Sequence, residues 1–287
     1  MKKNDKYSNM SVIEAQYEAQ KIAFAPFVFQ VSKALRDLKV LEILNPALDK
    51  GLTFQELMDK LSLSEYSLSV MLEAGVSIGL ILFEDDHYSL SKVGYFINSD
   101  EMTKVNMNFT QDVCYEGLKN LESSIVSERP SGLDFFGKWN TIYEGLTTLP
   151  KETQKSWYEF DHYYSDLAFD EILPIVFKNN PLKIFDFGGN TGRFAKKCLN
   201  YANNSSVTIF DHISQLEKAK KNFADDYSDR INFMGIDFLD LKLKTDERAD
   251  VVWMSQFLDC FSKDQVKDIL GLAKDILNPG GEIFIME

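Results

Sequence analysis

The sequence predicts an α/β fold: a mostly helical winged-helix domain, followed by a doubly wound parallel sheet of the Rossmann type. Apolar runs that carry an acidic residue at their end indicate the sheet, because parallel strands of this fold are buried on both faces and meet ligands at their carboxyl ends. We expect five strands, all parallel, near residues 183–187, 207–211, 231–236, 250–255 and 282–286.

A glycine-rich turn follows the first of these runs. The run 184–187 leads into Gly188 and Gly189, and Gly192 stands where the next helix would begin. Glycines let a backbone approach a ligand closely, but this spacing departs from the G-x-G-x-x-G pattern of dinucleotide sites. The carboxylate of Asp186 would also repel a pyrophosphate, whereas it suits a ligand that carries an ammonium and a sulfonium.

Acidic residues at the next two strand ends complete this pattern. Asp211 can accept hydrogen bonds from both hydroxyls of a ribose, Asp237 can accept one from an adenine amino group, and Phe238 offers the ring an apolar face. Each feature alone is also typical of a tight turn or a helix cap. Their order along the chain predicts S-adenosylmethionine as the cofactor. The residues predicted to bind it are Asp186, Gly188, Gly189, Asp211, Asp237 and Phe238.

Three segments carry a family resemblance. Residues 184–189 resemble motif I of class I S-adenosylmethionine-dependent methyltransferases, and 249–262 and 279–287 resemble the fourth and fifth strands of the small-molecule O-methyltransferases that include plant caffeate and bacterial polyketide enzymes. The resemblance implies methylation of a hydroxyl group on a small aromatic or polyketide-like acceptor, with Ser255 and Gln256 near the cofactor. A methyltransferase-like protein that binds the cofactor without catalysis is the alternative interpretation.

The catalytic base is where the chain departs from this family. The family places a histidine just after the fourth strand, in a Leu-His-Asp-Trp run, and this chain has Asp259 at that position. Asp259 is interpreted as a base with a pKa raised by burial, as a group that orients His162, or as a sign that the acceptor is already acidic. The predicted catalytic residues are therefore Asp259 and His162, and no metal site is predicted.

Residues 1–105 are organised as a winged helix. Helices are expected over 53–61 and 65–78, followed by two short strands within 80–90. No Lys or Arg occurs between Leu61 and Ser91, so the module lacks cations for phosphate contacts and a DNA-reading role is excluded. The resemblance implies a dimerisation domain instead.

An apolar helical stretch, 22–43, is expected to precede this module, broken near Pro26. It carries more apolar surface than a lone N-terminal helix would show to water, so we expect a homodimer in which the partner covers it; packing on the wing is the alternative. Residues 106–175 form a helical connection that the resemblance places at the acceptor pocket. Residues 176–287 form the cofactor-binding domain.

The composition of the chain bears on its partners and its cellular location. The chain has 287 residues, 45% of them hydrophobic, and its formal net charge of −13 argues against nucleic acid as a partner. Three cysteines are too few and too scattered for a disulfide framework, which predicts a reducing, cytoplasmic location. The apolar run 22–31 is too short to span a membrane.

The fifth predicted strand runs to the last residue, Glu287. The fold implied by the resemblance adds another helix and two more strands, in the order 3-2-1-4-5-7-6. We therefore expect a fragment of a longer gene product or a truncated relative, in which the fifth strand leaves an apolar edge exposed.

Overall fold

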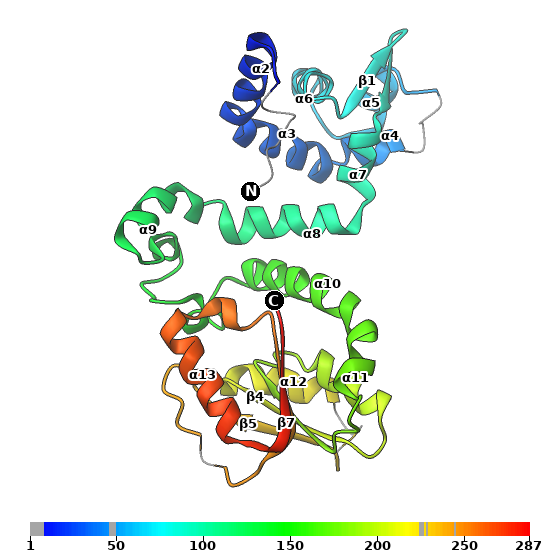
Figure 1. Cartoon of the computed structure of the whole chain (residues 1–287). Helices are drawn as coiled ribbons and strands as arrows, with labels where there is room; N and C mark the ends of the chain where they lie inside the picture. Colours follow the sequence, from blue (N-terminus) through cyan, green and yellow to red (C-terminus); the bar gives the residue numbers. More distant parts are fainter. Residues whose placement is uncertain (1–8, 46–49, 224–226, 228, 244) are drawn as a thin grey trace. The chain divides into compact units, whose positions relative to one another are not determined.

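A computed structural model describes residues 9–45, 50–223, 227, 229–243 and 245–287 (Figure 1). The chain divides into two compact units, Met1–Met107 and Asn108–Glu287. Within the described ranges, no helix combines the length and the apolar character needed to cross a membrane.

The N-terminal unit is helical and carries a two-stranded wing. Its elements are α2 (Val12–Ala23), α3 (Ala25–Asp37), α4 (Val40–Leu44), α5 (Phe54–Lys60), α6 (Glu65–Ser77), β1 (Ile81–Glu84), β2 (His87–Leu90), α7 (Lys92–Ser99) and α8 (Glu101–Phe109). Buried leucines hold it together, among them Leu35, Leu41, Leu57 and Leu72. β1 and β2 pair antiparallel, which confirms the predicted winged helix.

The apolar stretch 22–43 is helical and is broken at Phe24, near Pro26 as predicted, and a second time before α4. α2 begins at Val12, because the Ser11 hydroxyl accepts from the backbone N–H of Glu14 in a capping box. Pro26 stands in the first turn of α3, where its missing N–H leaves no bond unmade. Lys39, in the left-handed region at φ 64°, separates α3 from α4. Pro26 therefore starts a helix and does not interrupt one.

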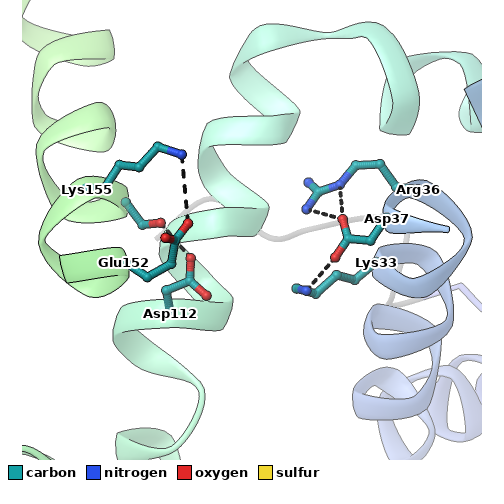
Figure 2. Close-up of polar contacts among 7 residues, drawn as sticks. Lys33, Arg36, Asp37, Asp112, Glu152 and Lys155 are labelled. Carbon is teal, nitrogen blue, oxygen red and sulfur yellow. Dashed lines mark hydrogen bonds and ion pairs between the residues drawn. The ribbon is translucent and has the colours of Figure 1, made fainter. Parts of the chain in front are cut away.

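Two cations neutralise an acidic residue at the end of α3. The Asp37 carboxylate accepts hydrogen bonds from Lys33 Nζ at 2.5 Å and from Arg36 Nε at 3.0 Å (Figure 2). Burial acts to raise the pKa of Asp37, but these two bonds hold it below its ordinary value. They offset the unfavourable placement of a carboxylate at a helix C-terminus.

Five parallel strands form the sheet of the C-terminal unit, as predicted. They are β3 (Lys183–Phe187), β4 (Ser206–Asp211), β5 (Ile231–Gly235), β6 (Ala249–Ser255) and β7 (Leu277–Met286). Their order is β5-β4-β3-β6-β7, so β3 lies in the centre. Phe187 of β3 pairs with Phe210 of β4 and Met254 of β6. The carboxyl ends of the three central strands therefore meet at one edge.

Helices cover both faces of this sheet. They include α11 (Arg193–Tyr201), α12 (Ile213–Phe223) and α13 (Lys263–Asp275). Ile184 belongs to the apolar core that contains α11 and α12, whereas its neighbour Phe185 belongs to the core that contains α13. Successive strand residues thus face opposite cores, as double winding requires.

Short helical segments and one long helix occupy residues 108–176. They are η2 (Thr110–Cys114), η3 (Gly117–Asn120), α9 (Leu121–Ser127), η4 (Ser131–Phe135), η5 (Ile142–Glu144) and α10 (Lys151–Val176). Ser156 Oγ of α10 donates to Asp112 Oδ2 of η2 at 2.6 Å (Figure 2). An ion pair of 2.6 Å between Asp170 and Lys197 joins α10 to α11. These contacts hold α10 beside the sheet.

Candidate functional site

Glycines shape the turn after β3. Gly188 (φ 67°) and Gly192 (φ 80°) adopt left-handed backbone conformations that favour glycine. A Cβ on Gly188 would collide with the Phe257 ring, and one on Gly189 would lie 2.7 Å from Asp186 Oδ2. The turn therefore keeps its backbone close to the Asp186 carboxyl group.

Two cavities lie where this turn meets the strand ends. Each holds about 50 Å³ of free volume. Both are lined by Asp161, Gly188, Asn190 and Gln256, so they adjoin. The predicted site residues that line the first cavity are His162, Asp186, Gly188, Gly189, Ser255 and Gln256. Those that line the second cavity are Gly188, Asp211 and Gln256.

Asp186 is a buried carboxyl group at the wall of the first cavity. It is 2% exposed, and its Oδ2 has no hydrogen-bond partner among the described residues. Burial, followed by the charge of Asp211, raises the pKa of Asp186 to about 8. A buried acceptor in this state is suited to a cationic ligand group, which would restore its ionised form.

Asp211 ends β4 and fastens the glycine turn. Its Oδ2 accepts from the backbone N–H of Asn190 at 2.9 Å, and its Oδ1 accepts from the N–H of His212 at 2.7 Å. Burial raises the pKa of Asp211 to about 6, although these two bonds act to lower it. Each carboxylate oxygen has a second lone pair, so Asp211 retains capacity for ligand hydroxyls.

Several buried polar atoms without a hydrogen-bond partner among the described residues belong to the lining of the first cavity. Leaving such an atom unpaired costs about 1–3 kcal/mol, so their gathering marks a ligand site. The carboxyl, amide, indole and hydroxyl groups fit a cofactor with an amino-acid end. The atoms are Asp186 Oδ2, Asn190 Oδ1, Trp253 Nε1 and Ser255 Oγ.

Asp237 and Phe238, predicted to contact the adenine, line neither cavity. Asp237 is exposed just beyond β5, and its Oδ1 accepts from the N–H of Leu239 at 2.9 Å. Phe238 is 1% exposed, with ring centroids 5.1 Å from Phe187 and 4.7 Å from Phe257. The Phe238 ring packs against these two rings in the apolar core of the sheet. This packing could not be predicted from the sequence, because the three residues lie far apart in it.

Asp161 is a site residue that sequence reasoning missed. It lines both cavities from α10. Burial first, and the charge of Asp259 second, raise the pKa of Asp161 to about 7. The spacing of Asp161, Ser165 and Phe169, four residues apart on one helix face, carries the signal, since all three line the first cavity.

His162 lies in the first cavity, but as a neutral ring. Its Nε2 is 3.2 Å from the Thr191 hydroxyl oxygen in the glycine turn. Burial, followed by the charge of Arg193, lowers the pKa of His162 to about 4. A histidine with such a pKa is a weak proton acceptor at neutral pH.

Asp259 stands just outside the cavities. It is exposed on the short helical turn η6 (Leu258–Cys260), and neither cavity is lined by it. Glu287 Oε1 fixes this turn by accepting from the N–H groups of Phe257 at 3.2 Å and Leu258 at 2.9 Å. The influence of Asp259 on the site is electrostatic, through Asp161 and Cys260.

A second histidine, also missed in the sequence, lines the second cavity. His212 directly follows Asp211, and its Nδ1 lies 2.8 Å from Ser214 Oγ. Its position after a strand-end carboxylate is the signal that was available. In the described part of the chain, no group of three or more His, Cys, Asp or Glu side chains is arranged to hold a metal ion.

Comparison with known families separates the chain into two matched parts. Residues 16–88 match the Dimerisation2-like domain. Residues 136–287 match the O-methyltransferase domain, which includes the glycine turn and both cavities' strand-end residues. No curated protein matches the chain.

Solved structures with the same fold span both units of the chain. The methyltransferase SibL is 22% identical, with a TM-score of 0.66 over 92% of this chain and 78% of that one. Human N-acetylserotonin methyltransferase, solved with S-adenosylmethionine, is 18% identical, with a TM-score of 0.69 over 97% and 80%. PigF, solved with S-adenosylhomocysteine, is 15% identical, with a TM-score of 0.74 over 94% and 80%. Because the O-methyltransferase domain covers more than half of the sequence, the protein belongs to the S-adenosylmethionine-dependent O-methyltransferase family.

Proposed function

We propose that the protein methylates a hydroxyl group of a small aromatic or polyketide-like acceptor. The observation that carries this proposal is the first cavity, where the unpartnered Asp186 carboxyl group adjoins the glycine turn. S-adenosylmethionine supplies an activated methyl group on a sulfonium. The chain must then bind this donor, orient the acceptor hydroxyl toward it and take up one proton.

The cofactor residues follow from the groups that each side chain offers. Asp186 binds the ammonium group, and the glycine turn, Gly188 and Gly189, lets the backbone approach it. Ser255 Oγ, which has no partner among the described residues, takes part in the same cavity, as does Gln256.

The ribose and adenine contacts extend from the second cavity. Asp211 accepts hydrogen bonds from the ribose hydroxyls with the lone pairs that the turn amides leave. Asp237 is exposed and near the end of β5, which suits a contact to the adenine amino group. Phe238 contributes its ring only if the aromatic contact with Phe257 opens.

Binding and transfer test this function separately. Isothermal calorimetry with S-adenosylhomocysteine measures the cofactor site, and transfer of a labelled methyl group from S-adenosylmethionine to a set of phenols measures the reaction. We expect binding and transfer in the wild type and in Glu171→Gln, an exposed control on α10. Binding without transfer would favour the cofactor-binding protein without catalysis, and absence of binding would remove the proposed site.

We also propose that the protein is a homodimer in the cytoplasm. The Dimerisation2-like match and the apolar side chains that α2 exposes support the dimer, among them Ile13 at 78% and Tyr17 at 63% exposure. The free state of Cys114, Cys198 and Cys260 supports the location.

A further inference from the structure

We propose that Asp161 is the base that takes the proton from the acceptor hydroxyl, and that Asp259 is a positioning residue that acts on Asp161 through its charge. This inference rests on the proposed function, since it names the proton acceptor of that reaction. Asp259, the aspartate that follows β6, therefore does not take the proton itself. Its negative charge acts on the carboxyl group of Asp161.

The place of Asp161 between the two cavities is the first argument. Among the described residues that line both cavities, which are Asp161, Gly188, Asn190 and Gln256, only Asp161 titrates. It reaches them from α10, whereas Gly188 and Asn190 belong to the turn after β3 that would hold the donor. A carboxyl group there lies within the space in which an acceptor hydroxyl must meet the donor methyl group.

The electrostatic surroundings of Asp161 are the second argument. Burial raises its pKa most, the negative charges of Asp259 and Glu287 raise it further, and a hydrogen bond from Trp157 lowers it, with a result of about 7. A base is most effective when its pKa lies near the working pH, because it is then both ionised and able to hold a proton.

The other titratable groups of the first cavity are less suited to this role. His162 has a pKa lowered to about 4, so it holds a proton poorly. Asp186, with its pKa raised to about 8, lies against Gly189 and is engaged by the proposed ammonium contact. Arg193 forms an ion pair with Asp166, and a guanidinium group offers hydrogen-bond donors only.

The second cavity offers no better base. Asp211 binds backbone N–H groups with both carboxylate oxygens, and its remaining lone pairs are assigned to the ribose hydroxyls. Burial raises the pKa of Tyr143, of Tyr158 and of Cys260 above their ordinary values, so these groups stay protonated near neutral pH. His212 lines the second cavity but not the first, and its Nδ1 is hydrogen-bonded to Ser214 Oγ.

The proton and electron balance of the step is simple. The acceptor O–H bond breaks and its proton passes to an oxygen of the Asp161 carboxylate. The hydroxyl oxygen forms a bond to the methyl carbon, and the electron pair of the carbon–sulfur bond remains on sulfur. One negative charge on Asp161 and one positive charge on sulfur are lost together, so the step creates no separated charges.

Infrared spectroscopy can measure the titration of Asp161 directly. The difference between wild-type and Asp161→Asn spectra isolates the C=O band of the protonated Asp161 carboxyl group. We expect this band to disappear with a midpoint near pH 7, as the pKa of about 7 requires. In the Asp259→Asn background the midpoint should move to lower pH, because a negative charge is removed. Glu171→Gln, on the same helix but exposed, should leave it unchanged.

Methyl transfer to two phenols then tests the proton transfer itself. At mildly alkaline pH, 4-nitrophenol is already ionised whereas phenol is not. Asp161→Asn should slow methylation of phenol by about 100-fold or more and change that of 4-nitrophenol by less than about threefold. Unchanged S-adenosylhomocysteine affinity shows that the variant is folded.

Three outcomes would overturn the inference. The first is an infrared titration midpoint of Asp161 below about pH 5, and the second is a midpoint that stays the same in Asp259→Asn. The third is an equal loss of methylation rate for phenol and 4-nitrophenol in Asp161→Asn. If the wild type methylates neither phenol while it binds S-adenosylhomocysteine, the proposed acceptor class fails. The infrared titration still decides the assignment of Asp161 in that case, because it needs no turnover.

Discussion

Buried carboxyl groups set the behaviour of individual residues in this site. Asp161, Asp186 and Asp211 all have pKa values raised by burial, to about 7, 8 and 6. Buried carboxyl groups without a cationic partner favour the neutral form. The site therefore holds protons that the unfolded chain would release, and a bound cation is expected to displace them.

The pH dependence of stability follows from Asp186. Its pKa is raised from 3.8 to about 8 in the folded protein. Between these values the unfolded chain releases a proton that the folded protein keeps, so the contribution of Asp186 to the free energy of unfolding falls as pH rises. Below 3.8 both states are protonated and the effect vanishes.

We expect Asp186→Asn to flatten this dependence, because the amide cannot ionise. The wild type should lose stability relative to the variant by up to about 1.4 kcal/mol for each pH unit within that interval. Urea unfolding of the cofactor-free proteins at several pH values measures the difference. If the difference in free energy of unfolding between the two proteins stays constant across this pH interval, the raised pKa of Asp186 is contradicted.

Asp211 is expected to contribute to cofactor affinity through hydrogen bonds to the ribose. Asp211→Ala should weaken S-adenosylhomocysteine binding by about 1.5–3 kcal/mol, the range for bonds to a charged group. Calorimetry measures the change, with exposed Asp275→Ala as the control. Because Asp211 also fastens the glycine turn, Asp211→Asn is measured beside it; an affinity equal to wild type in both variants would remove Asp211 from the ribose role.

The sequence places individual residues where strand ends determine their position. Asp186 and Asp211 follow from the chain order of the strands, and the structure brings them to one region. Asp161 was not predicted, because its role depends on how α10 packs against the strand ends. The burial of Phe238 depends on the rings of Phe187 and Phe257, which lie far from it in the sequence.

At the scale of whole elements, continuous burial made the strands predictable. β3 and β4 are buried along almost their entire length, so their apolar runs mark them clearly. α2 was not predicted, and none of its residues is buried within the chain, so packing against the core of its own chain does not account for its apolar side chains. The break predicted near Pro26 falls at Phe24, between α2 and α3, and Pro26 stands in the first turn of α3.

Caps define where several elements begin, and α13 offers a test. Its N-cap Ser262 accepts from the N–H of Gln265, and Gln265 Oε1 accepts from the N–H of Ser262 at 2.8 Å. Ser262→Ala should lower the free energy of unfolding by about 1 kcal/mol. Ser62→Ala, at an exposed serine in a turn, is the control. Equal effects of the two substitutions in urea unfolding would show that the capping box adds nothing.

At the scale of the whole molecule, α2 exposes large apolar side chains and buries none of its residues within the chain. Ile13 and Tyr17 are four residues apart on α2 and are 78% and 63% exposed, so they lie on one face of the helix. Phe24, at its C-cap, continues this face and is 55% exposed. Side chains of this size gain about 1.5–3 kcal/mol each when they are buried, and a second copy of the chain is the proposed cover.

The double variant Ile13→Glu/Tyr17→Glu should therefore convert the dimer to a monomer, with a dissociation constant raised by about 100-fold or more. Its fold should survive, because α2 buries none of its residues within the chain and glutamate is a good helix former. Sedimentation analysis over a range of protein concentrations measures the mass. Ile213→Glu, at an isoleucine that is 67% exposed on α12, controls for the added charge and should remain dimeric. If the double variant and the wild type dissociate at the same concentration, the face of α2 does not form the dimer.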